Sequence, residues 1–239
     1  MIGLRYVYAV CRPFGTPLQA QLTGLAGAPA GLLTHHGLVA VVSTVPEADF
    51  AARPLRAHLA DPAWRAAAER AHRGVIGALT TVTTPLPLRL GTVFQDDSGV
   101  RTMIEAREDD FRRTLDRLDG RVEWGVRAYA CRAADGPGAA RSSAARLHEV
   151  LSAHAEDARL RPCGAGDVPG RDGRSGARVL DAAYLVSRAH AEEFVELVER
   201  AGDAVPGPPG QAGRAVLAAG LQVELSGPSA AYSFAGDYL

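Results

Sequence analysis

A short apolar stretch near the middle of the chain, residues 83–94, constrains the fold most. It contains Pro85 and Pro87, and each proline fixes its own φ at about −65° and pushes the residue before it out of the helical region. The preceding helix must therefore have ended before the prolines. The stretch is predicted to be extended, and Gly91 is its predicted bulge or turn.

The one arginine in this stretch, Arg89, lies between Leu88 and Leu90. In a regular strand its side chain points away from both leucines, so it either reaches water or is buried beside a carboxylate or a carbonyl. We expect Arg89 to be buried and paired, so that it fixes the strand to a neighbouring element. Its replacement by alanine should then impair folding before it impairs any binding. A ligand-binding role is the alternative, because the guanidinium group also suits a carboxylate or a phosphate.

The composition excludes several classes of function. The formal net charge is −1 and every basic residue is an arginine, so we expect no nucleic acid and no membrane as partner, and no P-loop or Schiff-base lysine. Cys11, Cys131 and Cys163 lie far apart without CxxC spacing, which argues against a structural zinc site and a disulfide framework and favours a reducing cytoplasm. The sequence has no signal peptide and no long apolar window, so a soluble chain is expected.

Residues 1–119 are predicted to form an N-terminal α+β domain. Runs of β-branched and aromatic residues predict strands at 4–11 and 38–43. A helix is predicted to begin at Asp61-Pro62, where aspartate caps and proline occupies the first helical position. Its apolar stripe includes Trp64, and His72 beside the stripe is expected to be a hydrogen-bonded packing residue.

One further amphipathic helix, with a charged outer face, is predicted from Val100 to Leu118, after a turn and cap cluster at residues 95–99. Earlier in the chain, His35 and His36 lie at the turn into the second strand. We favour a polar loop tip over a metal site for this pair, because two adjacent side chains seldom face one ion and no third ligand is close in sequence.

Residues 120–225 repeat strands and helices in the order β-α-β-α-β, with strands at 121–131, 178–187 and 217–225. Amphipathic strands in this order suggest a ferredoxin-like sandwich in which one strand is missing or modified. Loops are expected at 161–177 and 202–213, which are rich in glycine, proline and charged residues.

The C-terminal tail, residues 226–239, carries Tyr232, Phe234 and Tyr238. Leaving three aromatic side chains in water is costly, so we expect the tail to dock on the N-terminal domain. A partner-binding tail is the alternative.

No complete catalytic, cofactor or metal motif occurs in the sequence, so we predict no catalytic residue, no cofactor and no metal. Two other classes remain open. An enzyme or small-molecule binder on the ferredoxin-like half would use Arg89 and His72. An RNA-binding module would need exposed aromatic residues on the sheet, for which Tyr129 and Tyr184 are candidates.

Taken together, these segments resemble the gas vesicle accessory proteins GvpF and GvpL over the whole chain. The most specific match is Pro87 to Phe94. The other matching segments are Tyr6 to Val10, Trp64 with His72, Glu123 to Arg127, Tyr184 to Val186 with Phe194, and Ser226 to Pro228 with Tyr232 to Phe234. Two departures stand out: Leu90 replaces the usual phenylalanine, and Ser229 to Ala231 replace a Trp-Pro-Pro segment.

The resemblance implies a two-domain, non-enzymatic, minor structural or assembly component of the gas vesicle. Its implied partners are the small hydrophobic shell protein and other accessory proteins, and its implied location is the gas-facing surface, after a cytoplasmic stage before assembly. Arg89, Gly91, Trp64 and His72 are then the structural clamp of the N-terminal domain, and Tyr232 and Phe234 are the tail contacts.

Overall fold

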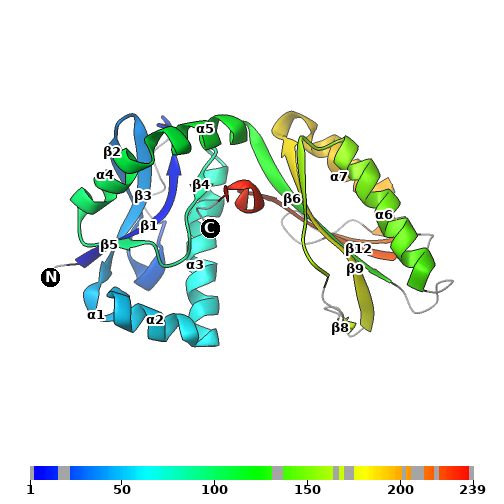
Figure 1. Ribbon diagram of the computed structural model, residues 1–239, viewed down its shortest axis with the longest axis horizontal. Coiled ribbons are helices and arrows are strands. Elements are labelled where there is room, and N and C mark those ends of the chain that lie inside the picture. The colour runs from blue at the N-terminus through cyan, green and yellow to red at the C-terminus, as the bar shows by residue number, and fades with distance from the viewer. Residues whose placement is uncertain are drawn as a thin grey trace. The chain divides into compact units, whose positions relative to one another are not determined.

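The computed structural model describes residues 3–15, 22–130, 137–163, 167–169, 175–200, 203–205, 213–217 and 221–236. It mixes helices with sheets (Figure 1), which confirms the predicted mixed fold class. The chain divides into two compact units, Met1–Asp119 together with Ala230–Leu239, and Gly120–Ser229. No helix among the described residues is long and apolar enough to cross a membrane.

The first unit is built on a five-stranded sheet, which has the order β2-β3-β1-β4 with β5 also paired to β1. The strands are β1 (Gly3–Cys11), β2 (Gly31–His35), β3 (Leu38–Pro46), β4 (Leu86–Pro87) and β5 (Val93–Phe94). Both predicted strands are present, and β3 runs to Pro46. The sequence reading missed β2, because its five residues carry no clear alternation.

A bulge in β1 changes which of its residues face the core that contains the tyrosines. The register with β3 shifts between Val7 and Ala9, so Tyr8 is the extra residue. Because a bulge inserts one residue, it reverses which residues point to each face. Tyr6 and Tyr8, and after the bulge Ala9 and Cys11, therefore belong to the same core cluster.

Helices cover both faces of this sheet. Buried residues of α1 (Glu47–Phe50), α2 (Ala52–Ala60) and α3 (Pro62–Thr80) join the cluster that contains the two tyrosines. On the other side, α4 (Asp97–Ala106) contacts β1, β2 and β5, and α5 (Glu108–Leu118) contacts β4. Asp61 caps α3 by accepting a hydrogen bond of 2.9 Å from the amide of Ala63, at the predicted start of the helix.

The single charged helix predicted over 100–118 is two helices, so that prediction was wrong. The chain leaves helical geometry at Arg107, where φ is −130° and ψ is 18°. The amide of Phe111 then donates to the Arg107 carbonyl and starts α5. No glycine or proline marks this break in the sequence, and the apolar periodicity continues across it.

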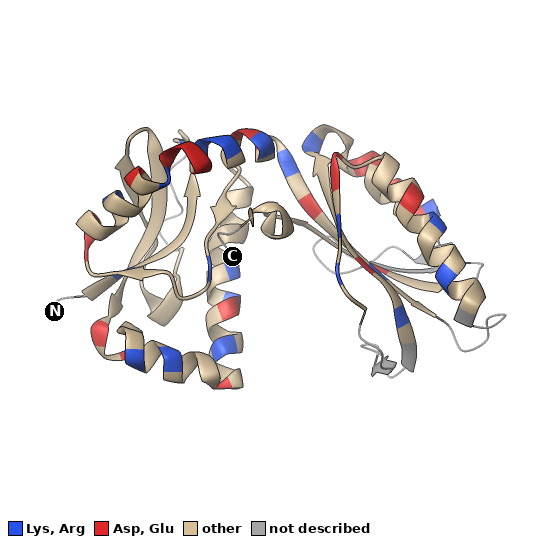
Figure 2. Cartoon of the chain, viewed as in Figure 1, with Lys and Arg blue, Asp and Glu red and all other residues tan. Residues whose placement is uncertain are grey.

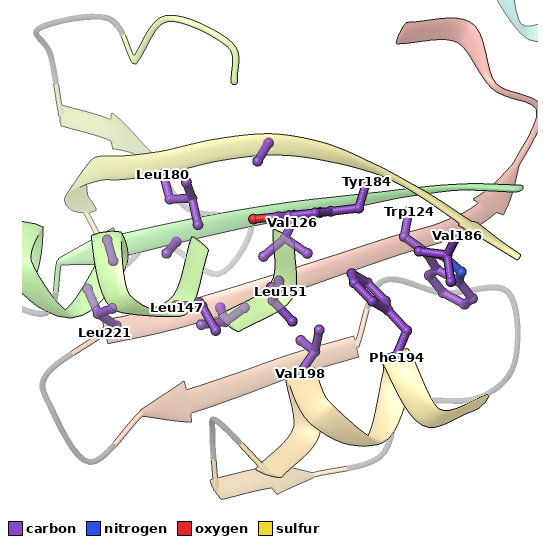
Figure 3. Packing of buried hydrophobic residues seen from close by; sticks show 14 of the residues in the cluster. Trp124, Val126, Leu147, Leu151, Leu180, Tyr184, Val186, Phe194, Val198 and Leu221 are labelled. Carbon is purple, nitrogen blue, oxygen red and sulfur yellow. The ribbon is translucent and has the colours of Figure 1, made fainter. Parts of the chain in front are cut away.

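The second unit contains a seven-stranded sheet with the order β10-β11-β12-β6-β9-β7, and β8 pairs with β9. Its elements are β6 (Arg121–Ala130), α6 (Pro137–Ala153), β7 (Asp157–Leu160), β8 (Asp167–Pro169), β9 (Ser175–Ser187), α7 (Ala191–Arg200), β10 (Asp203–Val205), β11 (Gly213–Leu217) and β12 (Leu221–Ser229). Figure 3 shows the core between sheet and helices: Trp124, Val126 and Tyr184 from the sheet meet Leu147 and Leu151 of α6 and Phe194 and Val198 of α7.

Three differences from the sequence reading concern strands of this unit. The unpredicted β7 pairs with β9 at the end of the sheet. In addition, β12 continues past Leu225 to Ser229 and pairs with Glu123 after a register shift, so its last four residues, expected in the tail, belong to the strand.

The third difference concerns the two segments expected to be loops. The first, 161–177, contains β8 and the start of β9, and the second, 202–213, contains β10 and the first residue of β11. The loop prediction was therefore wrong at these residues. Cys131 lies outside the described residues.

The described part of the tail, 230–236, packs within the first unit. Phe234 is only 1% exposed, and its carbonyl accepts a hydrogen bond from Arg117 of α5. Tyr232 packs against the core cluster of β1 and α3, and the guanidinium of Arg73 lies 5.9 Å from the centre of its ring. The short helix Tyr232–Phe234 therefore anchors this end of the chain by both apolar and polar contacts.

Replacing Phe234 by alanine should lower the free energy of unfolding by about 3–5 kcal/mol, because a fully buried ring leaves a cavity. The conservative change Phe234→Leu should cost less than about 1.5 kcal/mol. Denaturant unfolding followed by tryptophan fluorescence measures both variants. A loss below about 1 kcal/mol for Phe234→Ala would show that the ring contributes little to the first unit.

Candidate functional site

Arg89 is exposed, so the prediction of a buried arginine was wrong. The strand β4 covers only Leu86–Pro87, and after Leu88, which is 4% exposed, the chain turns toward Gly91. The backbone carbonyl of Arg89 closes this turn by accepting hydrogen bonds from the amide of Thr92 at 3.1 Å and from its hydroxyl at 2.7 Å. The backbone of this residue, rather than the burial of its guanidinium, fits the stretch into the fold.

Gly91 occupies the predicted turn. Its φ is +87°, a conformation that favours glycine, and a Cβ atom there would lie 3.4 Å from Cδ1 of Leu59. Its amide donates a hydrogen bond of 3.2 Å to the Tyr6 hydroxyl. The turn is therefore joined to β1 by a side chain.

His72 of α3 continues this connection inside the core. The imidazole is 4% exposed, and its Nδ1 lies 2.8 Å from the Tyr6 hydroxyl. It also hydrogen-bonds the backbone of Leu88, which raises its pKa and so identifies the carbonyl as the acceptor. We assign the N–H to Nε2 on this basis, and the Tyr6 hydroxyl then donates to Nδ1 while it accepts from Gly91.

Burial determines the protonation of this pair. It lowers the pKa of His72 to about 4, despite the hydrogen bond to Leu88. Burial also raises the pKa of Tyr6 above its ordinary value, and the nearby Tyr8 and Tyr232 hydroxyls add to the shift. Both side chains are neutral at pH 7 and already hydrogen-bonded internally.

The proposed pairing of Arg89 with His72 in a catalytic pocket has no geometric support. Arg89 is exposed, whereas His72 is buried and bonded to Tyr6 and Leu88. A polar cavity of ≈ 390 Å³ at the α4–α5 junction contains neither of them. Its lining residues are Glu105 to Asp110 and Arg113.

Trp64 is half-buried at the start of α3, where it joins two helices. Its ring stacks on His58 of α2 at a centroid distance of 5.0 Å and an interplanar angle of 15°. Phe50 of α1 lies on it at 5.9 Å. These contacts join α1, α2 and α3.

The two adjacent histidines lie at the tip of the β2–β3 hairpin and contact the α4–α5 junction. His35 Nε2 is 2.6 Å from Oε1 of Glu105, and His36 Nδ1 is 2.7 Å from Oε2 of Glu108. Hydrogen bonds from His36 and Arg112 lower the pKa of Glu108. The polar loop tip that the sequence indicated is thus tied to side chains about seventy residues away.

Sequence reasoning missed an ionic network on the sheet of the second unit. Glu123 and Asp181, each 5% exposed, project from neighbouring strands, β6 and β9. Arg161 contacts both carboxylates, at 3.1 Å and 3.5 Å. Arg127 and Arg178 add further contacts to Asp181. The alternation of β6 predicted a polar face, but only the strand order reveals which charges meet.

The aromatic residues of this sheet do not support the RNA-binding alternative. Tyr184 is buried in the core and lies 2.8 Å from Nδ1 of His148, so it cannot stack on a base. Tyr129 hydrogen-bonds Glu224 at 3.3 Å. Figure 2 shows arginine and acidic residues interspersed along α3 and α5.

Comparison with known proteins decides the family. Residues 4–137 and 133–236 match the family described as gas vesicle synthesis protein GvpL/GvpF. The chain belongs to the GvpL/GvpF family. It is 44% identical to gas vesicle protein L of Streptomyces sp. (strain CB03234), covering 98% of this chain and 93% of that protein. Gas vesicle protein F of the same strain is 26% identical, covering 82% of this chain and 89% of that protein.

Crystal structures of this GvpL/GvpF family share the fold. The gas vesicle protein GvpF from Anabaena sp. PCC7120 superposes with a TM-score of 0.69 at 16% identity, covering 98% of this chain and 96% of that chain. GvpF from Microcystis aeruginosa gives 0.65 at 18% identity, covering 98% and 99%. The fold is thus retained at low identity, and the resemblance inferred from the sequence is confirmed.

Acidification should destabilise the protein through His72. The unfolded chain takes up the proton at the ordinary pKa of 6.5, whereas the folded chain resists it down to about 4. The stabilisation from neutral His72 is therefore complete above pH 6.5 and is lost as the pH falls toward 4, by about 3 kcal/mol. The difference in unfolding free energy between wild type and His72→Leu, measured from pH 7 to pH 4, should shrink by that amount.

His58→Leu provides the matched control, since His58 is partly exposed and lies on the same layer of helices. The difference in unfolding free energy between wild type and His58→Leu should change by less than about 1 kcal/mol between pH 7 and pH 4. An unchanged difference for His72→Leu would mean that the imidazole is not held neutral in the core.

Proposed function

We propose that this protein is a non-enzymatic, minor structural or assembly component of the gas vesicle, which associates with the hydrophobic shell protein and other accessory proteins during vesicle formation. The observation that carries the proposal is the family match, which extends from residue 4 to residue 236. The greater identity to protein L than to protein F of one strain, 44% against 26%, supports assignment to the L branch.

The internal pairing of the ionisable groups supports a non-catalytic role. Catalytic groups need perturbed pKa values together with access to a substrate. His72 has a perturbed pKa, but its polar contacts are made to Tyr6 and Leu88 inside the core. The buried carboxylates Glu123 and Asp181 are likewise paired with arginines.

We also propose that the second unit is a modified ferredoxin-like domain. Its elements β6, α6, β7, β9, α7 and β12 follow the order βαββαβ, and their strands lie in the antiparallel order β12-β6-β9-β7. The strands β10 and β11 extend the sheet beyond β12, and β8 extends beside β9. The N-terminal domain then comprises residues 1–119 with the tail docked on it.

An edge strand offers a binding surface for an apolar partner. In the part of the chain that the structure describes, β2 pairs with β3 alone. Its Gly-Leu-Leu-Thr segment carries no charge, and Leu32 is 46% exposed. Uncharged edge strands are templates for strand addition, which is usually blocked by charges or proline. We assign this edge to the shell subunit, which the protein would hold until the subunit adds to the growing wall.

The hairpin register identifies which backbone groups face outward. His35 pairs with Leu38 across the two-residue turn, so these two residues exchange the closing hydrogen bonds. The next bonded pair is Leu33 with Ala40. The amides and carbonyls of Leu32 and Thr34 therefore point away from β3.

Thr34→Pro should weaken capture of the shell subunit by about 3–10-fold, because it removes one outward donor while leaving the bonds to β3 in place. Thr34→Ala is the matched control, since it keeps the amide and loses only the hydroxyl. Pull-down of co-expressed shell subunit with each variant measures the effect, and far-UV circular dichroism checks folding. Equal capture by both folded variants would exclude the β2 edge.

Deletion of the gene from its cluster tests the function as a whole. Vesicles should be absent or malformed by electron microscopy, and wild-type protein should restore them. On isolated vesicles the protein should resist protease until the vesicles are collapsed by pressure, as expected for a gas-facing location. Normal vesicles after deletion, together with no capture of the shell subunit, would contradict the proposal.

A further inference from the structure

The histidine hairpin brings together three side chains of the types that bind transition metals. One ligand atom from each of His35, His36 and Glu105 lies within 4.8 Å of the other two. The side chains are between one fifth and one half exposed, so an ion could reach them from solvent. We propose that these three residues bind a divalent transition-metal ion of the zinc type.

Binding an ion requires movements of side chains. A tetrahedral ion with ligand bonds of about 2.0–2.1 Å places neighbouring ligand atoms about 3.3 Å apart. His35 Nε2 and Glu105 Oε1 are now 2.6 Å apart in a hydrogen bond, and the ion would take the place of the shared proton. Partly exposed side chains can make such shifts by rotating about their own bonds.

The turn explains how adjacent histidines can face one ion. Consecutive residues of a regular strand point to opposite faces. Here His36 has a φ of +48° and Gly37 has a φ of +68°, as in a two-residue hairpin turn. The positive φ thus brings the two adjacent imidazoles to the same side of the hairpin, where they stack with centroids 4.3 Å apart and an angle of 19°. Because the lone pair of an imidazole nitrogen lies in the plane of the ring, one ring rotates out of the stack when both coordinate one ion.

A second layer of contacts orients the histidine pair. Glu108 accepts a hydrogen bond from Nδ1 of His36 at 2.7 Å. Arg112 donates to Glu108 at 2.9 Å and to the His36 carbonyl at 2.5 Å. A carboxylate on one imidazole nitrogen is the usual support for a metal ligand at the other nitrogen. Coordination through Nε2 of His36 keeps this support intact.

The ligand set selects the class of ion. Two imidazole nitrogens and one carboxylate oxygen suit zinc and its neighbours, whereas magnesium and calcium prefer oxygen ligands alone. Three protein ligands leave a fourth position for water or for a partner's side chain. The cavity at the α4–α5 junction shares Glu105 with the group and provides room for this fourth ligand.

The test is titration of Zn²⁺ alone into the full chain by calorimetry, in a Cys163→Ser background that removes an exposed thiol. One ion should bind per chain. Glu105→Gln and His35→Gln should each weaken binding about 100-fold or more, and Glu108→Gln about 10–100-fold, as expected for an outer-layer partner. His154→Gln, which changes an exposed histidine in the second unit, should have no effect.

Co²⁺ gives an independent readout, because a tetrahedral site with histidine ligands produces visible absorption without a thiolate charge-transfer band. That spectrum should appear in wild type and vanish in Glu105→Gln, while metal-free thermal unfolding shows that both are folded. Equal Zn²⁺ affinity in wild type, Glu105→Gln and His35→Gln would overturn the proposal. So would a thiolate band, or a loss of binding in His154→Gln as large as in Glu105→Gln.

Discussion

The hydrogen bond between Tyr6 and His72 joins segments of the first unit that lie far apart in the sequence. One hydroxyl and one imidazole join β1, α3 and the turn between Leu88 and Gly91. The groups are buried, so loss of any one leaves its partners unsatisfied at a cost of about 1–3 kcal/mol. The proline-rich stretch contributes the Leu88 carbonyl and the Gly91 amide to this pair. Arg89, in the same stretch, is exposed.

A second set of buried hydrogen bonds in the first unit is centred on Tyr8. Tyr8 accepts from the amide of Leu25 and donates to Ser43, which bonds the Pro29 carbonyl, so a second buried chain fastens the loop before β2. The buried polar side chains Tyr6, His72, Tyr8 and Ser43 all make internal hydrogen bonds. The surface of the first unit includes the charged faces of its helices, the uncharged edge of β2 and, at the end of that edge, the histidine pair.

Much of the fold could be predicted because local chemistry and tertiary contacts agree. Residue type predicted the cap at Asp61, the turn at Gly91 and the strands around Tyr6 and Val41, because each of these residues strongly favours the conformation it adopts. The strand β2 and the helix break at Arg107 could not be predicted, because tertiary contacts rather than sequence patterns determine them. The family resemblance supplied the family and the basis of the proposed function, which no motif in the sequence indicated.

The sites were harder to predict than the fold, for reasons that particular residues make clear. Arg89 was expected to be buried because a regular strand would direct its side chain toward a partner on a neighbouring element, but the short β4 and the following turn leave it exposed. His35 and His36 lacked a third ligand nearby, and Glu105 comes from a distant helix. Glu123 and Asp181 meet only because β6 and β9 are neighbours.

A double-mutant cycle between Tyr6 and His72 tests the central claim most directly. The variants are Tyr6→Phe, His72→Leu and the combination, and the measured quantity is the free energy of unfolding at pH 7. If the pair joins the three segments, the two losses will fall short of additivity by about 1–3 kcal/mol, as in a buried hydrogen-bond network. Losses that add to within about 0.5 kcal/mol would show that the two side chains stabilise the fold independently, and would contradict the account.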